Sequence, residues 1–270
     1  MNPPLVDIGL NLAHDSFDPD RERVVEAAIG AGVRWMVITG STLESTRAAV
    51  ELARQRTAHF RATAGIHPHH AREFHAADLP ALRALLQAPE VGAAGECGLD
   101  WFRNFSPHED QDRVFRQQLE LAAELGKPLF LHQRDAHDAF TAILREYLPR
   151  IAGGVAHCFT GDRRELDDYL DLGLSIGITG WICDERRGRH LRDLVGRIPA
   201  DRLMLETDAP YLLPRDLEPR PRSRRNEPRH LPHILRVVAE CRGEAPEAVA
   251  AASTHNALRF FGFEQYATTN

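Results

Sequence analysis

Glutamate and histidine residues stand at the C-terminal ends of several short apolar stretches of this sequence. Glu96, His132 and His157 each end a run of apolar residues and glycines. A buried carboxylate is costly unless it is paired or bound to a cation. One carboxylate and two imidazoles also leave coordination positions open for water, as a hydrolytic metal site requires. A lone histidine at such a place is more often a hydrogen-bonded core residue, but the three residues together predict a divalent metal site.

Asp208 is a second carboxylate that could take part in catalysis. It lies in the segment Glu206-Thr207-Asp208-Ala209-Pro210-Tyr211. A carboxylate beside metal-bound water can take its proton and hold it for attack. We predict that Asp208 is a further metal ligand or the general base, and that Glu96 and Asp208 are the catalytic carboxylates. The alternative is that Asp208 caps a turn before the proline. Three polar residues near predicted strand ends are expected to orient the ligands: Asp7, Asn11 and Glu206.

Cationic and aromatic residues in the predicted loops could hold a phosphate-bearing substrate. Arginines are dense between residues 215 and 229, which predicts an anion-binding rim, although a charge run is usually a solvated surface. Loop aromatics could stack on bases, or could pack as anchors of their loops. Histidines after the third predicted strand could contact phosphate or a second metal ion. The predicted substrate-binding residues are His67, His69, Arg134, Trp181, Arg224 and Arg225.

Short apolar segments alternate with amphipathic helical segments along the chain. The predicted strands are Val6–Leu10, Trp35–Thr39, Phe60–Gly65, Val91–Gly95, Pro128–His132, Gly154–His157, Leu174–Ile178 and Leu203–Glu206. The predicted helices are Arg21–Ala31, Leu43–Arg56, Leu79–Leu86, His108–Leu125, Asp135–Tyr147, Arg163–Leu172, Leu191–Val195, Pro232–Cys241 and Pro246–Phe261. This alternation predicts an α/β fold, a single (β/α)8 TIM barrel domain over residues 1–270, with the metal site at the C-terminal ends of the strands. A doubly wound sheet is the alternative, but its glycine-rich fingerprint is missing after the first strand.

The amino-acid composition favours a globular protein and argues against a membrane protein or a protein that coats nucleic acid. Hydrophobic residues make up 43% and charged residues 27% of the chain, which is ordinary for a globular protein. The formal net charge of −6 argues against a protein that coats nucleic acid by bulk electrostatics, so a phosphate would have to be held locally. We see no apolar run long enough to span a bilayer and no signal peptide pattern, and we expect a cytoplasmic protein without a membrane partner. The four cysteines lack a CxxC pair and are expected to be reduced thiols.

Five segments, in order along the chain, carry a resemblance to a known family. They are Gly65-Ile66-His67-Pro68-His69, Gly95-Glu96-Cys97-Gly98-Leu99-Asp100, Leu131-His132-Gln133-Arg134, His157-Cys158-Phe159-Thr160-Gly161 and Glu206-Thr207-Asp208-Ala209-Pro210-Tyr211. The chain resembles the TatD-type metal-dependent deoxyribonucleases, a branch of the amidohydrolase-like barrels. Further agreement at residues 178–187 and 223–228 makes the match specific.

The resemblance implies hydrolysis of phosphodiester bonds with Mg²⁺, or with Mn²⁺ in its place. It further implies a 3′→5′ exonuclease that acts on single-stranded DNA and accepts RNA, with a role in DNA repair or in the turnover of DNA fragments. One departure concerns the metals. The wider family opens with Asp-x-His-x-His, whereas this chain has Asp7-Ile8-Gly9-Leu10-Asn11, so we expect one firmly held ion and a second that is weak, transient or absent.

Other functions stay open at this stage. The same barrel could hydrolyse small esters or amides, or could deacylate D-aminoacyl-tRNA, as some relatives of the family do. The chain could also be a binding module without activity, which the intact set of Glu96, His132, His157 and Asp208 argues against. We expect a monomer by default.

Overall fold

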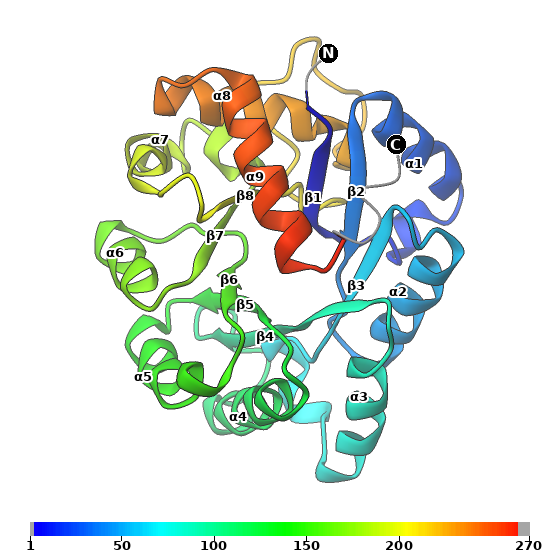
Figure 1. The fold of residues 1–270 in the computed structure, drawn as a ribbon, viewed down its shortest axis with the longest axis vertical. Helices are drawn as coiled ribbons and strands as arrows, with labels where there is room; N and C mark the ends of the chain where they lie inside the picture. Colours follow the sequence, from blue (N-terminus) through cyan, green and yellow to red (C-terminus); the bar gives the residue numbers. More distant parts are fainter. Residues whose placement is uncertain (1–2, 264–270) are drawn as a thin grey trace. The chain divides into compact units, whose positions relative to one another are not determined.

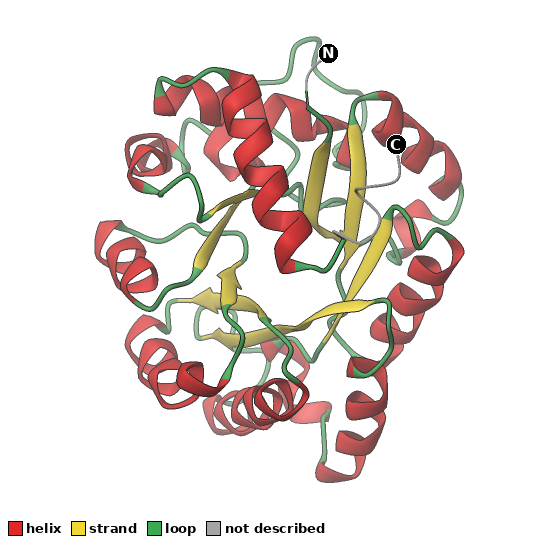
Figure 2. Ribbon diagram, viewed as in Figure 1, coloured by secondary structure: helices red, strands yellow, loops and turns green. Residues whose placement is uncertain are grey.

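The structure of the chain is a computed structural model that describes residues 3–263. The ends of the predicted domain, residues 1–2 and 264–270, lie outside this range. Strands and helices alternate along the described chain (Figure 1; Figure 2). The strands are β1 Leu5–Leu10, β2 Val33–Ile38, β3 Phe60–Ala64, β4 Val91–Asp100, β5 Leu129–Arg134, β6 Gly154–Ala156, β7 Ser175–Ile178 and β8 Leu203–Leu205.

Each helix expected from the hydrophobic pattern is present, and each end lies within two residues of its predicted position. The helices are α1 Arg21–Gly30, α2 Leu43–Gln55, α3 Leu79–Leu86, α4 His108–Leu125, α5 His137–Tyr147, α6 Arg163–Asp171, α7 Arg189–Leu194, α8 Leu231–Arg242 and α9 Pro246–Phe260. Local chemistry explains where α2 begins, because Thr42 and Ser45 exchange side-chain to backbone hydrogen bonds in a capping box. Short 3-10 turns, such as η2 Pro68–Glu73 and η5 Gly180–Cys183, were not predicted.

The strands form one sheet in the order β1 to β8. Leu10 at the end of β1 forms a parallel bridge with Ala209, just after β8. Consecutive parallel strands with intervening helices, and a first strand that meets the last, are the (β/α)8 TIM barrel predicted from the sequence. None of the described helices is long and apolar enough to cross a bilayer.

The chain divides into two compact units. Unit 2 holds Ile38–His157 and Asp167–Leu174, and unit 1 holds the rest of the described chain, residues 3–37, 158–166 and 175–263. In unit 2, strands β3 to β6 pair in parallel, and α4 and α5 follow β4 and β5 along the chain. In unit 1, β7 pairs with β8, and β1 bridges to Ala209. That residues 1–270 form one domain stays a prediction.

Strand β4 does not end where the sequence suggested. It runs on to Asp100, with Gly98 opposite His132 and Asp100 opposite Arg134 of β5. Gly98 has a φ of +150°, and a Cβ atom at this position would lie 1.8 Å from the His132 carbonyl oxygen. Only glycine allows the two backbones this approach. The prediction that this strand ends at Gly95, directly before Glu96, is therefore wrong, because Gly98 lets β4 continue to pair with β5.

Candidate metal centre

The carboxylate of Glu96 lies among three imidazoles in unit 2. Its Oε1 atom is 3.1 Å from His132 Nδ1, 3.3 Å from His67 Nε2 and 3.6 Å from His157 Nε2. The side chains of Glu96 and His157 are buried. Ligand-capable atoms of His67, Glu96 and His132 all lie within 4.8 Å of one another. The structure thus brings the three predicted ligands of unit 2 together around one carboxylate oxygen.

His132 lies between two carboxylates. Its Nδ1 faces Glu96, and its Nε2 is 3.3 Å from Oδ2 of Asp100. The same Asp100 oxygen is 2.7 Å from His69 Nε2. A histidine that binds a metal ion through one nitrogen commonly donates its other N–H to a carboxylate, which fixes the ring and its tautomer. Asp100 is placed to do this for His132, so that Nδ1 is the nitrogen available to a cation.

His67 has a different role from His132. Its Nδ1 accepts a hydrogen bond from the backbone N–H of His69 at 3.1 Å. In a neutral imidazole that leaves the proton on Nε2, the nitrogen that faces Glu96. A nitrogen that carries a proton cannot ligate a metal ion, so His67 is a hydrogen-bond donor in this site. Of the two roles expected from the sequence, contact with phosphate or with a second metal ion, a donor on Nε2 favours phosphate, and substrate binding by His67 stays a prediction.

Charge is balanced locally around Glu96. Burial by itself would raise the pKa of Glu96, but His67, His157 and His132 hold the pKa well below its usual range. Burial lowers the pKa of His67 to about 4 against the opposing effect of Glu96, with a further lowering from His132 and His69. His67 is therefore neutral near pH 7, and Glu96 is an anion.

Asp100 and His132 each favour the charged form of the other. Burial opposes ionisation of Asp100, but hydrogen bonds from His132 and His69 hold its pKa below the usual range. Burial likewise opposes the charge on His132, but its hydrogen bonds to Asp100 and Glu96 raise its pKa. Two carboxylates therefore favour the protonated form of the His132 ring between them. A divalent cation suits this donor set, because it can replace the proton on His132 Nδ1 and neutralise Glu96.

The predicted residues of unit 1 gather around the segment that follows β8. Asn11 donates from Nδ2 to Asp208 Oδ1 at 3.1 Å. Asp7, which is fully buried, accepts hydrogen bonds from the backbone N–H and the hydroxyl of Thr207. Glu206 accepts a hydrogen bond from the backbone N–H of Cys158. These contacts fit the expected orienting roles of Asp7 and Asn11, whereas the convergence of Asp208 with Glu96 stays a prediction.

The remaining predicted substrate-binding residues have distinct surroundings. The Arg134 guanidinium lies over the exposed ring of Phe102, 4.2 Å from its centroid. Trp181 and Arg224 line a pocket in unit 1. Arg225 is held by Asp20 at 2.8 Å and by Glu227 at 2.9 Å. Its guanidinium therefore has fewer free donors for phosphate than that of Arg224.

Asp100 is the site residue that sequence analysis did not single out. A signal was present, because positions 96, 98 and 100 of an extended strand point to the same face, and Gly98 leaves room between the two carboxylates. Cys97 lies between them on the opposite face and is buried. Burial and the adjacent Glu96 raise the pKa of its thiol, which disfavours the thiolate that a nucleophile requires.

Comparison with known proteins agrees with this arrangement. The family described as TatD related DNase matches residues 6–262. The chain belongs to the TatD related DNase family. A TatD relative from Erwinia billingiae, named 3′-5′ ssDNA/RNA exonuclease TatD, is 55% identical over 95% of this chain and 98% of its own length. Membership in this family makes the chain a nuclease, that is, a hydrolase.

Solved structures agree on the fold. YJJV, a TatD homologue from Escherichia coli K12, is 28% identical, has a TM-score of 0.87, and matches over 96% of this chain and 98% of its own. A TatD family hydrolase from Entamoeba histolytica is 24% identical with a TM-score of 0.88, and matches over 97% of this chain and 99% of its own. The second likeness bears on the fold alone. Both support the same barrel fold along nearly the whole chain.

Proposed function

We propose that the chain is a metal-dependent exonuclease that hydrolyses phosphodiester bonds of single-stranded DNA and of RNA from the 3′ end. The observation that carries this proposal is the buried Glu96 carboxylate, which has three imidazole nitrogens within 3.6 Å of one oxygen. Such a group of donors costs free energy in the folded chain unless it binds a cation. The name of the relative from Erwinia billingiae supports the polarity and the substrate.

The proposed ligands of the ion are Glu96, His132, His157 and Asp208. Mg²⁺ is proposed as the resident ion, and Mn²⁺ is its expected substitute because carboxylate and water oxygens suit both ions. When bound, the ion would polarise a phosphate oxygen and lower the pKa of a water molecule. Asp100 holds the His132 ring from the side opposite Glu96, which keeps Nδ1 directed at the site.

The chain's own groups supply the proton transfers. Asp208 accepts the proton of the attacking water, and Asn11 orients this carboxylate by its hydrogen bond to Oδ1. His67 would donate a hydrogen bond from Nε2 to a phosphate oxygen of the substrate. His69 and Arg134 are proposed to bind the substrate phosphates as well. Charge on the phosphate oxygens builds up during in-line attack, and these donors stabilise it.

We further propose the setting in which the enzyme works. It acts as a monomer with one domain over residues 1–270, in the cytoplasm, on single strands that arise in DNA repair or in the turnover of DNA fragments. The family resemblance supports this setting.

A time course on labelled oligonucleotides tests the proposed activity. With Mg²⁺ or Mn²⁺, a 5′-labelled single strand should give a ladder that shortens one nucleotide at a time, and a 3′-labelled strand should release labelled mononucleotide at once. Chelator should stop both reactions. A purified protein that is inert on single strands in metal-replete buffer, or a ladder from the 3′-labelled strand, would contradict the proposal.

A pair of histidine variants tests the metal assignment. His132→Ala should lower turnover by at least ~100-fold, because it removes a ligand and the charge stabilisation that the bound ion provides. His255→Ala removes an exposed histidine of α9 and is the matched control. Circular dichroism should show both variants folded. Wild-type turnover by His132→Ala would show that the ligand set is wrong.

A further inference from the structure

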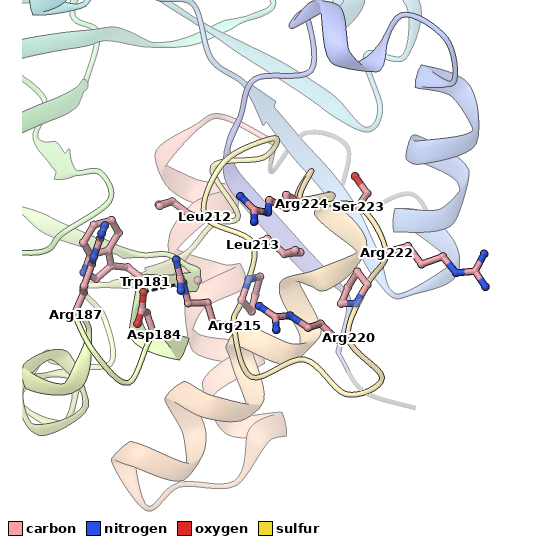
Figure 3. Close-up of a pocket in the computed structure, with 13 residues that line it drawn as sticks. Trp181, Asp184, Arg187, Leu212, Leu213, Arg215, Arg220, Arg222, Ser223 and Arg224 are labelled. Atoms are coloured by element: carbon pink, nitrogen blue, oxygen red, sulfur yellow. Dashed lines mark ion pairs between the residues drawn. The ribbon is translucent and has the colours of Figure 1, made fainter.

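A pocket of about 580 Å³ lies in unit 1, between η5 and the segment from residue 212 to 224 that follows β8. Figure 3 shows its lining side chains, with Trp181 and Arg187 coming from η5 and the turn after it. The volume is within the range of roughly 300–1,000 Å³ that is typical of small-molecule sites. We call this site the arginine pocket.

The arginine pocket carries an excess of positive charge. Of its described lining residues, Asp184 alone is acidic, and it pairs with Arg215 at 3.0 Å, the dashed contact in Figure 3. Arg220, Arg222 and Arg224 are exposed, and none of them forms an ion pair within residues 3–263. In a chain with a net charge of −6, unpaired cations on one short loop create a local positive field.

An aromatic side chain accompanies these cations. Trp181 is half-buried in the pocket wall, and the Arg187 guanidinium lies 5.8 Å from its ring centroid. Leu212, Leu213 and Pro214 add an apolar surface. Arginines beside a tryptophan, with apolar surface around it, are the combination by which proteins hold single-stranded nucleic acid, through phosphates and a stacked base.

The loop that presents the arginines is fixed at two points on its sides. Asp216 accepts a hydrogen bond from His233 Nε2 of α8 at 2.6 Å. Arg225, just past the pocket, is held by Asp20 and Glu227. A binding surface that is already ordered loses less conformational entropy when a ligand binds. The residues on both sides of Arg220, Arg222 and Arg224 are therefore held by contacts of their own.

We propose that the arginine pocket binds one nucleotide of a single-stranded DNA or RNA, with its base on Trp181 and the flanking phosphates on Arg220 and Arg224. This inference rests on the proposed function and deepens it, because it names the part of the chain that holds the strand. Since every base has a stacking face and every nucleotide has a phosphate, the pocket should bind strands with little sequence preference.

The salt dependence of binding tests the phosphate contacts. We would measure binding of a fluorescent oligodeoxythymidine strand by anisotropy, in chelator to prevent cleavage, at a series of salt concentrations. Each phosphate contact on a single strand adds ~0.7 to the slope of log affinity against log salt, so Arg220→Gln with Arg224→Gln should reduce the slope by ~1.4. The matched control, Arg145→Gln with Arg259→Gln, removes two exposed arginines from α5 and α9 and should leave the slope unchanged.

The stacking contact has a separate signature. Trp181→Ala should weaken binding about tenfold at every salt concentration while leaving the slope as in the wild type. Trp181→Phe, which keeps an aromatic face, should recover most of the affinity. Thermal melting of each variant shows whether it is folded.

Two results would overturn the assignment. The double variant Arg220→Gln with Arg224→Gln could keep the wild-type slope, or Trp181→Ala could bind as tightly as the wild type. Because binding is read in chelator without turnover, these failures are distinct from failure of the proposed activity. An inert wild-type enzyme that still shows both signatures would contradict the exonuclease but support the arginine pocket.

Discussion

At the residue scale, the candidate centre depends on which nitrogen of each histidine carries a proton. His67 Nδ1 is occupied by the backbone N–H of His69, and His132 Nε2 faces Asp100. The two rings lie beside the same Glu96 oxygen, yet only His132 can present a lone pair to a cation. The hydrogen bond at the ring nitrogen that faces away from Glu96 therefore decides whether each histidine donates a proton or can bind a cation.

Asp100→Asn tests this division of roles. We expect metal affinity, measured by calorimetry, to fall ~10- to 100-fold, because the amide orients His132 without the charge that raises its basicity. Turnover should recover toward the wild-type value as the metal concentration rises, since Asp100 positions a ligand and does not bind the ion itself. Asp193→Asn, an exposed substitution on α7, is the control. Turnover that stays low at saturating metal would show that Asp100 has a direct part in catalysis.

Asp7 predicts a pH dependence of stability. Burial raises its pKa to about 7, against the opposing effect of hydrogen bonds from Thr207. In the unfolded chain its pKa is ~3.9. The folded state therefore holds this proton more tightly, so its contribution to stability is complete below pH ~4 and is lost as the pH rises toward 7.

Asp7→Asn is the variant that isolates this effect, because the amide cannot ionise. The difference in unfolding free energy between Asp7→Asn and the wild type should shift in favour of the variant as the pH rises from 5 to 7, by at most ~1.4 kcal/mol per pH unit. Urea titrations at a series of pH values measure this difference. A constant difference across the range would mean that Asp7 is already ionised in the folded protein.

At the element scale, the site depends on how far β4 stays beside β5. Glu96 and Asp100 share a face of one strand, and Gly98 between them lies against the His132 carbonyl group. The close approach sets His132 between the two carboxylates. The strand that carries the acids and the strand that carries the histidine are therefore positioned by a residue with no side chain.

Gly98→Ala should be severely destabilising. The added Cβ would lie 1.8 Å from the His132 carbonyl oxygen at a φ of +150°, so strain and steric overlap together should cost at least ~3 kcal/mol of unfolding free energy. Gly196→Ala is the matched control, because nothing lies within 4 Å of a Cβ there, and it should change stability by less than ~1 kcal/mol. Urea unfolding compares the two. Equal stabilities would mean that β4 and β5 can separate at no cost.

The sequence was sufficient to predict the alternation of strands and helices, because apolar runs and amphipathic periods are local signals. The same kind of local signal singled out Glu96, His132 and His157, since each follows an apolar run, and their role as metal ligands stays a prediction. It misplaced the end of β4, because a glycine usually marks a strand end, whereas Gly98 is here a close contact between strands. The proton positions on His67 and the role of Asp100 depend on contacts between residues far apart in sequence, and no local pattern contains them.

At the scale of the whole molecule, charge is distributed unevenly. The chain is acidic overall, at −6, whereas the arginine pocket gathers cations that lack acidic partners within the described chain. A polyanionic strand would be repelled by the average surface and attracted by this one region. Such a charge distribution favours binding of a nucleic-acid strand at the arginine pocket over binding along the whole protein surface. It also predicts weak binding to duplex DNA of any length.

The buried donors around Glu96 couple metal binding to the stability of the entire chain. They are gathered only in the folded state, so an ion that binds them stabilises that state by ~2.7 kcal/mol when its concentration is 100 times its dissociation constant. Mg²⁺ or Mn²⁺ should therefore raise the melting temperature of chelator-treated protein by several degrees. Glu96→Gln should abolish the rise, because the amide cannot neutralise the ion, whereas Glu247→Gln, an exposed substitution on α9, should retain it. Scanning calorimetry at matched ionic strength separates this effect from the screening of surface charges by salt.

Two outcomes would contradict this prediction. A rise of wild-type size in Glu96→Gln would mean that the stabilising ion binds elsewhere, and the absence of any rise in the wild type would mean that the folded chain has no preformed metal site.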